Sequence, residues 1–275
     1  MEATRALIAL SGGVDSSVAA YLSVQAGYEC TGSTMRLFDN EDIGIAAEST
    51  CCSLADIEDA RAVCNLLEIP YYVFNFTDTF AEQVIDRFIK AYERGWTPNP
   101  CIDCNRFLKF ERLLARAHET GFEYVVTGHY ARREYDKGSG RYLLKRGLDQ
   151  NKDQSYVLYA ITQEQLAHTL LPLGEMTKEQ VRELAHQQGF PNADKSESQD
   201  ICFVPDRDYG AFIRRYTGRN YEAGDILDVG GERIGSHEGI IDFTVGQRKG
   251  IGIAVGLPLY VTDIIPGTAT VVVGR

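Results

Sequence analysis

No apolar run in this 275-residue chain approaches the ~20 residues that a membrane-spanning helix requires. The first residues, MEATRALIALSGG, also lack the pattern of a signal peptide, because a short apolar stretch leads directly into two glycines. Both absences predict a cytoplasmic protein. The number of cysteines is odd, with seven in all, so they cannot all be paired in disulfides within the chain. A chain of this length does not need disulfides, so we expect buried, catalytic or metal-bound cysteines.

The chain also lacks the positive charge that indiscriminate nucleic-acid binding requires. Its 28 Lys and Arg against 39 Asp and Glu give a net charge of −11. Segment 130–152 is an exception, with seven basic and three acidic residues. The basic residues are Arg132, Arg133, Lys137, Arg141, Lys145, Arg146 and Lys152. This zone fits either a solvated hairpin or a specific polyanionic partner held at one face.

Strand-like and helix-like segments alternate over the first 130 residues. Strands are expected at 5–11, 28–38, 70–76 and 124–130, and helices at 14–27, 54–67, 79–94 and around 107–117. This alternation predicts an α/β fold with a parallel, Rossmann-like sheet and helices on both faces. Ligands of such sheets bind beyond the carboxyl ends of the strands.

The character of the chain changes after residue 130. A hairpin is expected at 131–147, with glycines in its turn, and a threonine-capped helix at 177–189. From about residue 206 the chain is rich in glycine and in short β-like runs. We therefore expect two domains, with residues 1–205 forming the catalytic α/β domain and residues 206–275 forming a small β-rich domain.

The strongest local signal is SGGVDSS, residues 11–17, between an expected strand and an expected helix. Backbone N–H groups of a glycine turn at a helix N-terminus form a cradle for anions. The lysine of the G-x-x-x-x-G-K-[ST] phosphate loop is missing, so this is a different kind of nucleotide loop. It resembles the S-G-G-x-D-S pyrophosphate-binding loop of the PP-loop ATPases, which implies cleavage of ATP between its α and β phosphates.

A second motif is TPNPCIDCNR, residues 97–106. A structural zinc site usually needs two such cysteine pairs, and only one is present. A redox pair normally opens a helix after the first strand, whereas this one follows two prolines. Asn105 is expected to cap the next helix, which would place Cys104 at its N-terminus near Arg106 and Lys109. That setting favours a thiolate, with a pKa of about 3.5–7.5, so Cys104 is either a nucleophile or a buried inert thiol.

The isolated Cys202, in SQDICF at residues 198–203, adds a third thiol. A PP-loop, a C-x-x-C loop and a distant cysteine together suggest sulfur transfer. With these motifs, the chain resembles the tRNA-specific 2-thiouridylases over nearly its whole length. The matching stretches are SGGVDSSV, CCSLADIEDAR, PYYVFNF, TPNPCIDCNRFLKF, TGHYAR, KDQSYVL, SQDICF and SHEGIIDFTVGQRKGIGIA. The resemblance implies 2-thiolation of the wobble uridine in tRNAs for Lys, Glu and Gln.

The resemblance also implies residue roles. ATP would be bound by Leu10, Ser11, Gly12, Gly13, Val14, Asp15, Ser16, Ser17, Met35 and Gly128. The target base and the tRNA would be bound by Asn99, Pro100, Cys101, His129, Lys152, Asp153 and Gln154. Cys104 would be the nucleophile and Cys202 would carry a persulfide from a sulfur-donor protein, with Mg²⁺ accompanying ATP.

Two features depart from the family pattern. Many members carry aspartate in place of Cys101, so a [4Fe–4S] cluster on Cys101, Cys104 and Cys202 is an alternative to the persulfide route. The chain also stops at Arg275, where members continue into a further β-barrel, and we expect that barrel to be absent. Hypotheses of other classes are an amidating PP-loop synthetase, which needs no such cysteines, and a tRNA-binding protein without turnover.

Overall fold

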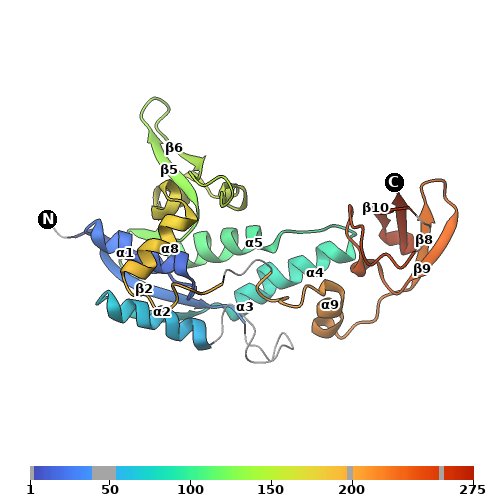
Figure 1. Cartoon of the computed structure of the whole chain (residues 1–275), viewed down its shortest axis with the longest axis horizontal. Helices are drawn as coiled ribbons and strands as arrows, with labels where there is room; N and C mark the ends of the chain where they lie inside the picture. Colours follow the sequence, from blue (N-terminus) through green and yellow to red (C-terminus); the bar gives the residue numbers. More distant parts are fainter. Residues whose placement is uncertain (1–2, 39–53, 197–200, 254–256) are drawn as a thin grey trace.

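The computed structural model describes residues 3–38, 54–196, 201–253 and 257–275. The molecule is elongated, with a parallel sheet at one end, a four-stranded sheet at the other, and long helical segments between them (Figure 1). Cys51 and Cys52, whose roles the sequence leaves open, lie outside the described residues. So do residues 198–200 of the SQDICF stretch.

The larger sheet is parallel throughout, with strand order β3-β2-β1-β4-β7. Its strands are β1 Arg5–Ala9, β2 Glu29–Arg36, β3 Tyr71–Asn75, β4 Tyr124–Val126 and β7 Thr169–Leu170. The predicted α/β class is therefore confirmed. The order runs outward from β1 in both directions, so β1 and β4 form the point where ligands of open α/β sheets bind.

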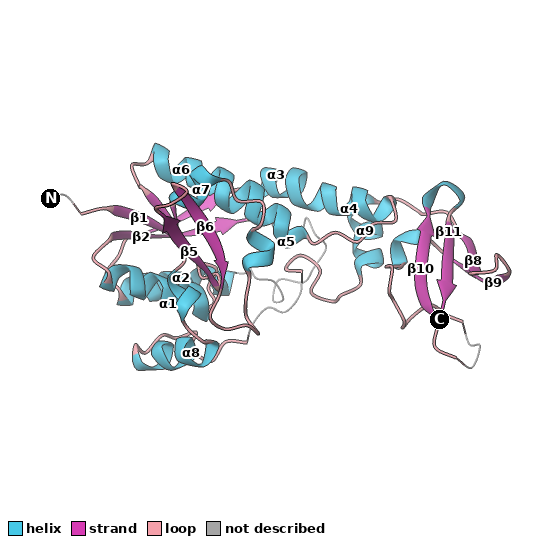
Figure 2. Ribbon diagram, turned by 90° about the horizontal axis from the view of Figure 1, so that it is seen from above, coloured by secondary structure: helices cyan, strands magenta, loops and turns pink. Residues whose placement is uncertain are grey.

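Helices cover both faces of this sheet because its central strand is apolar on both sides. In β1, Ala6 and Ile8 pack in one core cluster with helices α1 Val14–Gln25, α2 Leu54–Leu66 and α8 Lys178–Gln187. The alternate residue Leu7 packs with η2 Cys104–Leu113 and α6 Leu114–Glu119. Figure 2 shows these two layers on opposite sides of the strands. Alternation of side chains along a strand produces this three-layer arrangement.

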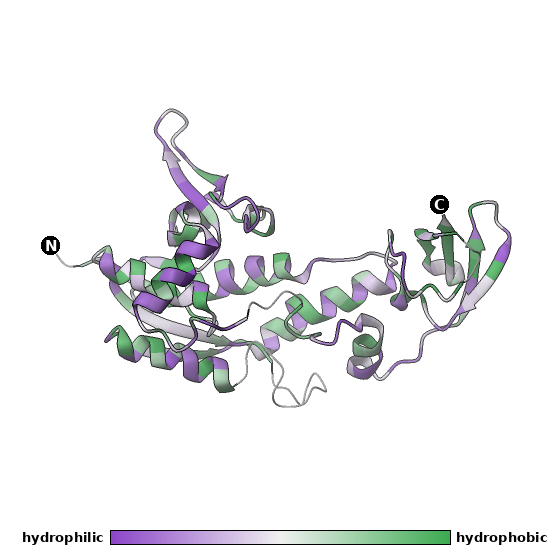
Figure 3. Cartoon of the chain, in the orientation of Figure 1, coloured by the Kyte–Doolittle hydropathy of each residue, from purple (hydrophilic) through white to green (hydrophobic). Residues whose placement is uncertain are grey.

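Two continuous helical rods cross the middle of the molecule. One joins α3 Thr77–Phe80, the π-helical η1 Ala81–Ile85 and α4 Asp86–Glu93, and the other joins α5 Pro100–Asp103, the π-helical η2 and α6. The first rod buries apolar side chains against α9 Tyr209–Thr217 and the second sheet. Figure 3 shows hydrophobic and hydrophilic residues interspersed along this rod. Phe203 is fully buried there, with its ring 5.6 Å from Phe80 and 5.4 Å from Phe88. Burial of such a ring contributes about 3 kcal/mol and fixes the backbone beside Cys202.

A two-stranded hairpin projects from the parallel-sheet region (Figure 1). It consists of β5 Ala131–Asp136 and β6 Arg141–Arg146, paired antiparallel as the sequence predicts. Short helical segments support it, namely η3 Ser155–Leu158, α7 Gln163–Ala167 and η4 Pro172–Glu175. Helix α8 begins behind Thr177, which forms the predicted threonine cap as part of a capping box with Gln180.

The second sheet has the order β10-β11-β8-β9, with one parallel pair, β11–β8, between two antiparallel pairs. Its strands are β8 Gly224–Asp228, β9 Arg233–His237, β10 Tyr260–Ile265 and β11 Thr270–Gly274, with short segments η5 Ile240–Asp242 and η6 Pro266–Thr268. A β-rich second region is thus present, while the exact domain boundary at residue 205 stays a prediction. Over the described residues, the helices are all too short or too polar to span a bilayer.

Candidate active site

The loop between β1 and α1 carries the SGGVDSS motif at the carboxyl end of the sheet. Gly12 has a φ of +74°, and a Cβ there would lie 2.5 Å from the carbonyl oxygen of Asp56, so only glycine fits. The hydroxyls of Ser16 and Ser17 donate to the Gly13 carbonyl at 2.9 and 3.0 Å. Gly13 is the N-cap of α1 and contributes no side-chain cap. The N-terminus of this 12-residue helix therefore has no side-chain cap, and an uncapped helix N-terminus is able to accept an anion such as phosphate.

Asp15 of the motif is held by two side chains that are distant in sequence. Its Oδ1 accepts from the Lys178 ammonium at 2.7 Å and from the Tyr130 hydroxyl at 2.7 Å. The Lys178 side chain is only 7% exposed. A buried ammonium needs such a partner, because an unpaired charge in that environment is costly. The contact fixes α8 against the start of α1.

The outer side of the motif loop is fastened by the segment that leads toward Cys202. The amide of Asn192 donates to the Gly12 carbonyl and to the Ser17 hydroxyl, both at 2.9 Å. The Lys195 ammonium donates to Asp56 at 2.7 Å and to Asp59 at 2.5 Å. Burial lowers the pKa of Lys195, but the hydrogen bonds that it donates to both aspartates raise its pKa overall, so the lysine stays charged.

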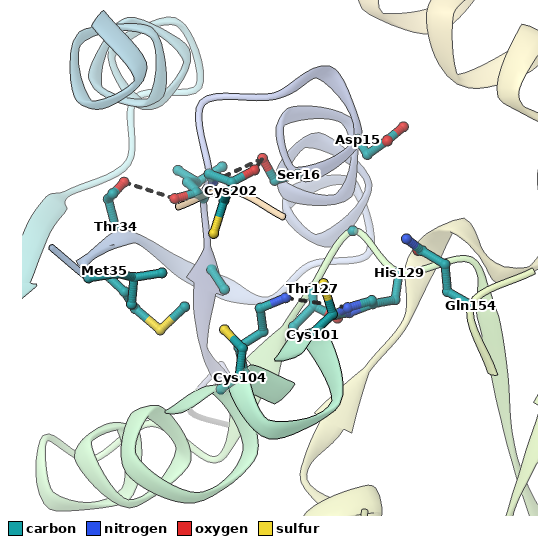
Figure 4. A pocket seen from close by; sticks show the side chains of 16 residues that line it. Asp15, Ser16, Thr34, Met35, Cys101, Cys104, Thr127, His129, Gln154 and Cys202 are labelled. Atoms are coloured by element: carbon teal, nitrogen blue, oxygen red, sulfur yellow. Dashed lines mark hydrogen bonds between the residues drawn. The ribbon is translucent and has the colours of Figure 1, made fainter. Parts of the chain in front are cut away.

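A cavity of about 310 Å³ opens beside the motif loop, between the ends of β1, β2 and β4 (Figure 4). A volume of this size lies in the range of small-molecule sites. It is lined by Ala9, Leu10, Ser11, Asp15, Ser16, Thr34, Met35, Leu37, Cys101, Cys104, Lys109, Thr127, Gly128, His129, Gln154 and Cys202. Gly128 has no room for a side chain, because a Cβ would lie 2.8 Å from the Ser16 backbone nitrogen. The loop that follows β4 can therefore pack directly on the start of α1.

Three cysteines from two distant parts of the chain face this cavity. Cys101 and Cys104 come from the α5–η2 rod, and Cys202 comes from the segment anchored by Phe203. Figure 4 shows their sulfur atoms around the same space as Met35 and Ser16. Cys104 and Cys202 are half-buried, and Cys101 is exposed. In contrast, Cys30 and Cys64 lie in the core, where burial raises the pKa of each thiol, to about 11 and about 12.

The predicted helix start at Asn105 is wrong. The helix begins at Pro100, and Asn99 is its cap, with Oδ1 accepting from the Cys101 backbone N–H at 3.1 Å. Proline at the first helical position, after an asparagine, is a recognisable start signal. Asn105 is instead buried, and its amide donates to the Val157 carbonyl at 3.1 Å. Cys104 therefore lies one turn inside the rod rather than at its N-terminus.

The expected lowering of the Cys104 pKa is also wrong. Burial of the thiol raises its pKa above the ordinary value, and the nearby charges of Cys101 and Asp103 act in the same direction. The Lys109 ammonium opposes this shift without reversing it. The helix-terminal effect that would favour the thiolate is weak here, because the four-residue helix α5 precedes Cys104.

His129 follows β4 and is only 7% exposed. Its Nδ1 lies 2.8 Å from the Thr127 hydroxyl, and its Nε2 lies 3.4 Å from the Lys109 ammonium. Burial and the positive charge of Lys109 both hold the His129 pKa well below 6.5. The ring is therefore neutral, and because Lys109 can only donate, Nε2 is the acceptor and Nδ1–H donates to Thr127.

The predicted KDQ segment, residues 152–154, forms a turn beside the cavity. Gln154 lines the cavity, and its Oε1 accepts from the Tyr130 backbone N–H at 3.0 Å. Asp153 accepts from the Gly147 backbone N–H at 2.9 Å and from the Ser155 hydroxyl at 2.8 Å. Burial alone would raise the pKa of Asp153, but these hydrogen bonds lower it, so the carboxylate stabilises the turn.

The cavity thus brings together only part of the set of residues predicted for the site. Those that line it are Leu10, Ser11, Asp15, Ser16, Met35, Gly128, Cys101, Cys104, Cys202, His129 and Gln154. Those that lie outside its lining are Gly12, Gly13, Val14, Ser17, Asn99, Pro100, Lys152 and Asp153. Sequence analysis missed Thr34, Thr127 and the full role of Lys109. Thr127 and Lys109 lie within the quoted stretches TGHYAR and TPNPCIDCNRFLKF, but only the fold shows that they line the cavity.

A metal-binding arrangement is not formed by the described part of the chain, in which no three His, Cys, Asp or Glu side chains are placed to hold an ion. Cys101, Cys104 and Cys202 share the cavity without forming such a set. An iron–sulfur cluster needs convergent thiolates, so the arrangement does not fit one.

Comparison with known families gives two matches that together span nearly the whole chain. The model for the tRNA methyl transferase HUP domain matches residues 4–206. The model for the tRNA methyl transferase PRC-barrel domain matches residues 210–275.

Curated relatives are similar over almost the full chain. A tRNA-specific 2-thiouridylase of Caldanaerobacter subterraneus subsp. tengcongensis is 54% identical over 271 residues, which cover 98% of this chain and 74% of that protein. The corresponding protein of Moorella thermoacetica is 53% identical over 98% of this chain and 75% of its own length. That of Clostridioides difficile is 49% identical over 98% and 74%. The chain therefore spans about three-quarters of the length of these relatives.

Solved structures give only a weaker likeness. A 4-thiouridine synthetase in complex with RNA and ATP matches with a TM-score of 0.49 and 20% identity, over 74% of this chain and 45% of that one. A nicotinamide mononucleotide synthetase of Francisella tularensis matches with a TM-score of 0.45 and 20% identity, over 80% of each chain. Likenesses at this level carry no functional argument.

Proposed function

The chain belongs to the family of tRNA-specific 2-thiouridylases, and on that premise we propose that it is an ATP-dependent tRNA-uridine 2-sulfurtransferase. Its substrate would be the wobble uridine of tRNAs for Lys, Glu and Gln. The observation that carries the proposal is the cavity itself. The cavity is lined both by Ser11 and Ser16 of the motif loop and by the thiols of Cys104 and Cys202.

ATP activates the base in the first step. The phosphates would lie at the N-terminus of α1, where Gly13 leaves the backbone N–H groups uncapped, and adenosine would lie against Met35 and Gly128. Uridine O2 attacks the α phosphate, pyrophosphate departs, and the poor leaving group at C2 becomes AMP. Mg²⁺ carried on the phosphates would offset their charge, since this ion is bound largely by phosphate oxygens and water.

Sulfur replaces the activated oxygen in the second step. A donor protein loads one sulfane sulfur on Cys202 as a persulfide. The Cys104 thiolate attacks the Cys202 sulfur, which forms a Cys104–Cys202 disulfide and releases the terminal sulfur as hydrosulfide. Hydrosulfide adds to C2 and AMP leaves with the bonding pair. Two electrons pass from the Cys104 thiolate to the sulfane sulfur, so an external dithiol must reduce the disulfide before the next cycle.

The tRNA would approach from the side of the β5–β6 hairpin. This hairpin and the following loop carry the basic residues of segment 130–152, which suits a phosphate backbone. Tyr156 and Tyr159 follow the loop with 66% and 67% of their surface exposed and their rings 6.4 Å apart. Exposed aromatic rings beside a basic hairpin suit stacking with unpaired anticodon bases. The target uridine must be flipped out to reach the buried cavity, where Cys101 and His129 would contact it.

A Cys202→Ala variant tests this function. Recombinant protein, ATP, a persulfide donor and unmodified tRNA are incubated, and 2-thiouridine is detected as a mobility shift in a mercury-containing gel. The variant should lose thiolation by at least about a thousandfold and bind ATP as tightly as the wild type. Cys30→Ala, which removes a core thiol, is the matched control and should thiolate normally.

Three outcomes would replace the proposal. Unchanged 2-thiouridine yield in Cys202→Ala would remove the persulfide route. Wild-type protein that binds tRNA and ATP but forms no 2-thiouridine would instead be a tRNA-binding protein without turnover. Release of pyrophosphate with transfer of ammonia rather than sulfur would indicate an amidating enzyme of the same fold.

A further inference from the structure

Lys109 brings a positive charge to the cavity from the same rod as Cys104. Among the cavity-lining residues in the part of the chain that the structure describes, it is the one Lys or Arg. The two residues are five positions apart in η2, which is π-helical. In an α-helix, positions i and i+5 point roughly 140° apart. In a π-helix, where hydrogen bonds join i and i+5, the two positions lie on nearly the same face.

The Lys109 ammonium is held by a short chain of polar groups that ends in a buried hydroxyl. It lies 3.4 Å from Nε2 of His129, and Nδ1 of the same ring lies 2.8 Å from the Thr127 hydroxyl (Figure 4). His129 and Thr127 are both more than nine-tenths buried. A neutral imidazole accepts a hydrogen bond from an ammonium without adding a charge that repels it. These two hydrogen bonds therefore orient the Lys109 side chain within the cavity.

The charges around Cys104 come from several elements. On its own rod, Lys109 favours the thiolate, whereas Asp103 and Cys101 oppose it. Across the cavity, Asp15 of α1 is already paired with Lys178 and Tyr130, and Cys202 and His129 are the remaining titratable groups. Lys109 is thus the cation that can offset the burial of Cys104.

We propose that Lys109 is a positioning residue, held by His129 and Thr127, whose ammonium stabilises the Cys104 thiolate in the cavity. The Cys104 proton leaves to solvent, and the resulting negative charge is paired with the Lys109 ammonium. The use of this thiolate in sulfur transfer rests on the proposed function, but the ion pair does not. The two ideas can therefore fail separately.

Alkylation of Cys104 in the absence of tRNA tests the ion pair directly. Wild-type protein and the Lys109→Met and Lys109→Arg variants are treated with iodoacetamide between pH 6.5 and 10. Fragmentation of the labelled peptide by mass spectrometry separates Cys104 from Cys101. Arg112→Met removes a basic residue from the same rod outside the cavity lining and is the matched control. Thermal unfolding of each variant confirms that it folds.

Loss of a nearby opposite charge should raise the apparent pKa of Cys104 by about one unit or more. At pH 8, Lys109→Met should therefore be alkylated at Cys104 roughly tenfold more slowly than the wild type, since one pKa unit is a tenfold change. Lys109→Arg should stay within about threefold, and Arg112→Met should be unchanged. Equal Cys104 rates in the wild type and Lys109→Met across the pH range would overturn the proposal.

His129→Leu gives a second measurement that leaves Lys109 in place. It should shift the Cys104 alkylation profile in the same direction by a smaller amount, because the ammonium loses its acceptor. If Lys109→Met does not fold, this variant decides the question, and an unshifted profile in His129→Leu would count against the proposal. Normal wild-type thiolation together with a Lys109-independent profile would leave the proposed function standing and remove the ion pair.

Discussion

The parallel-sheet region and the four-stranded-sheet region use buried polar groups for different ends. Around the motif loop, the side chains of Ser16, Lys178 and Asn192 are buried, and each donates a hydrogen bond to a residue of the loop beside the cavity. In the second region, His237 is buried with Nε2 bonded to the Ala269 carbonyl at 2.9 Å and Nδ1 accepting from the Gly239 N–H at 3.0 Å. Burying a polar group is costly unless it is hydrogen-bonded. In the first region these hydrogen bonds hold the motif loop beside the cavity, and in the second they join the end of β9 to the residue before β11.

This contrast predicts which substitutions affect ligand binding and which affect stability alone. The largest difference is expected at two glycines. Gly12→Ala should lower the free energy of unfolding by at least about 2 kcal/mol and abolish ATP binding, because the φ of +74° and the 2.5 Å contact with Asp56 exclude a Cβ. Gly267→Ala in the second region has open space around its Cβ position and should change stability by less than about 0.5 kcal/mol.

Urea unfolding followed by circular dichroism, together with isothermal titration of ATP, measures both glycine effects. Equal effects of the two substitutions would show that the motif loop tolerates a side chain. The inference that this loop binds the phosphates of ATP through closely packed backbone would then be wrong.

Two ion pairs sharpen the comparison at a smaller magnitude. Lys178→Met leaves the partly buried Asp15 carboxylate without its ammonium and should cost about 2 kcal/mol, with weaker ATP binding. Arg233→Met breaks an exposed pair with Asp225, whose side chains are 62% and 51% exposed, and should cost less than about 1 kcal/mol. The double variant Lys178→Met/Asp15→Asn should recover part of the lost stability. A double variant no more stable than Lys178→Met would contradict this electrostatic explanation.

The smallest effects concern the two buried histidines and pH. Burial lowers the pKa of His237, and burial with Lys109 lowers that of His129. The unfolded chain takes up protons as pH falls through about 6.5, while the folded rings stay neutral. The stabilising contribution is therefore present above pH 6.5 and is lost as pH falls toward the folded pKa values. Each histidine contributes a slope of at most about 1.4 kcal/mol per pH unit.

Chemical denaturation between pH 7.5 and 5 measures this slope in the wild type and in His129→Gln and His237→Gln. Each substitution should flatten the slope, but only His129→Gln should also alter the reactivity of Cys104. A steeper slope in either variant would mean that the ring is charged in the folded state.

Much of the fold follows from local patterns in the sequence. Strands and helices alternate with clear punctuation, so the strand at residues 71–75 and the helix from Leu54 were predictable. The Thr177 cap was equally clear, because a threonine precedes an amphipathic stretch with Gln180 at the third position. Such signals involve residues only a few positions apart in the chain, so they can be recognised in the sequence itself.

The site was less predictable, because its contacts join distant segments. The Lys178–Asp15 pair connects residues 163 positions apart. Lys109 and Cys104 both line the cavity from a π-helical segment, and that helix type is not marked by the local sequence patterns described above. The correct start of the helix was predictable from the local sequence, since Asn99-Pro100 is itself a helix start signal. The direction of the Cys104 pKa shift was not predictable in this way, because burial of the thiol is a property of the assembled fold.

The most direct test of the account is capture of a bond between Cys104 and Cys202 during one catalytic cycle. Enzyme loaded with a Cys202 persulfide is mixed with ATP and excess tRNA, quenched in acid and alkylated, and its peptides are analysed without reduction. The account predicts a Cys104–Cys202 linked peptide that forms at the rate of 2-thiouridine and in nearly equal amount. Full formation of 2-thiouridine with no linked peptide at any time would contradict it.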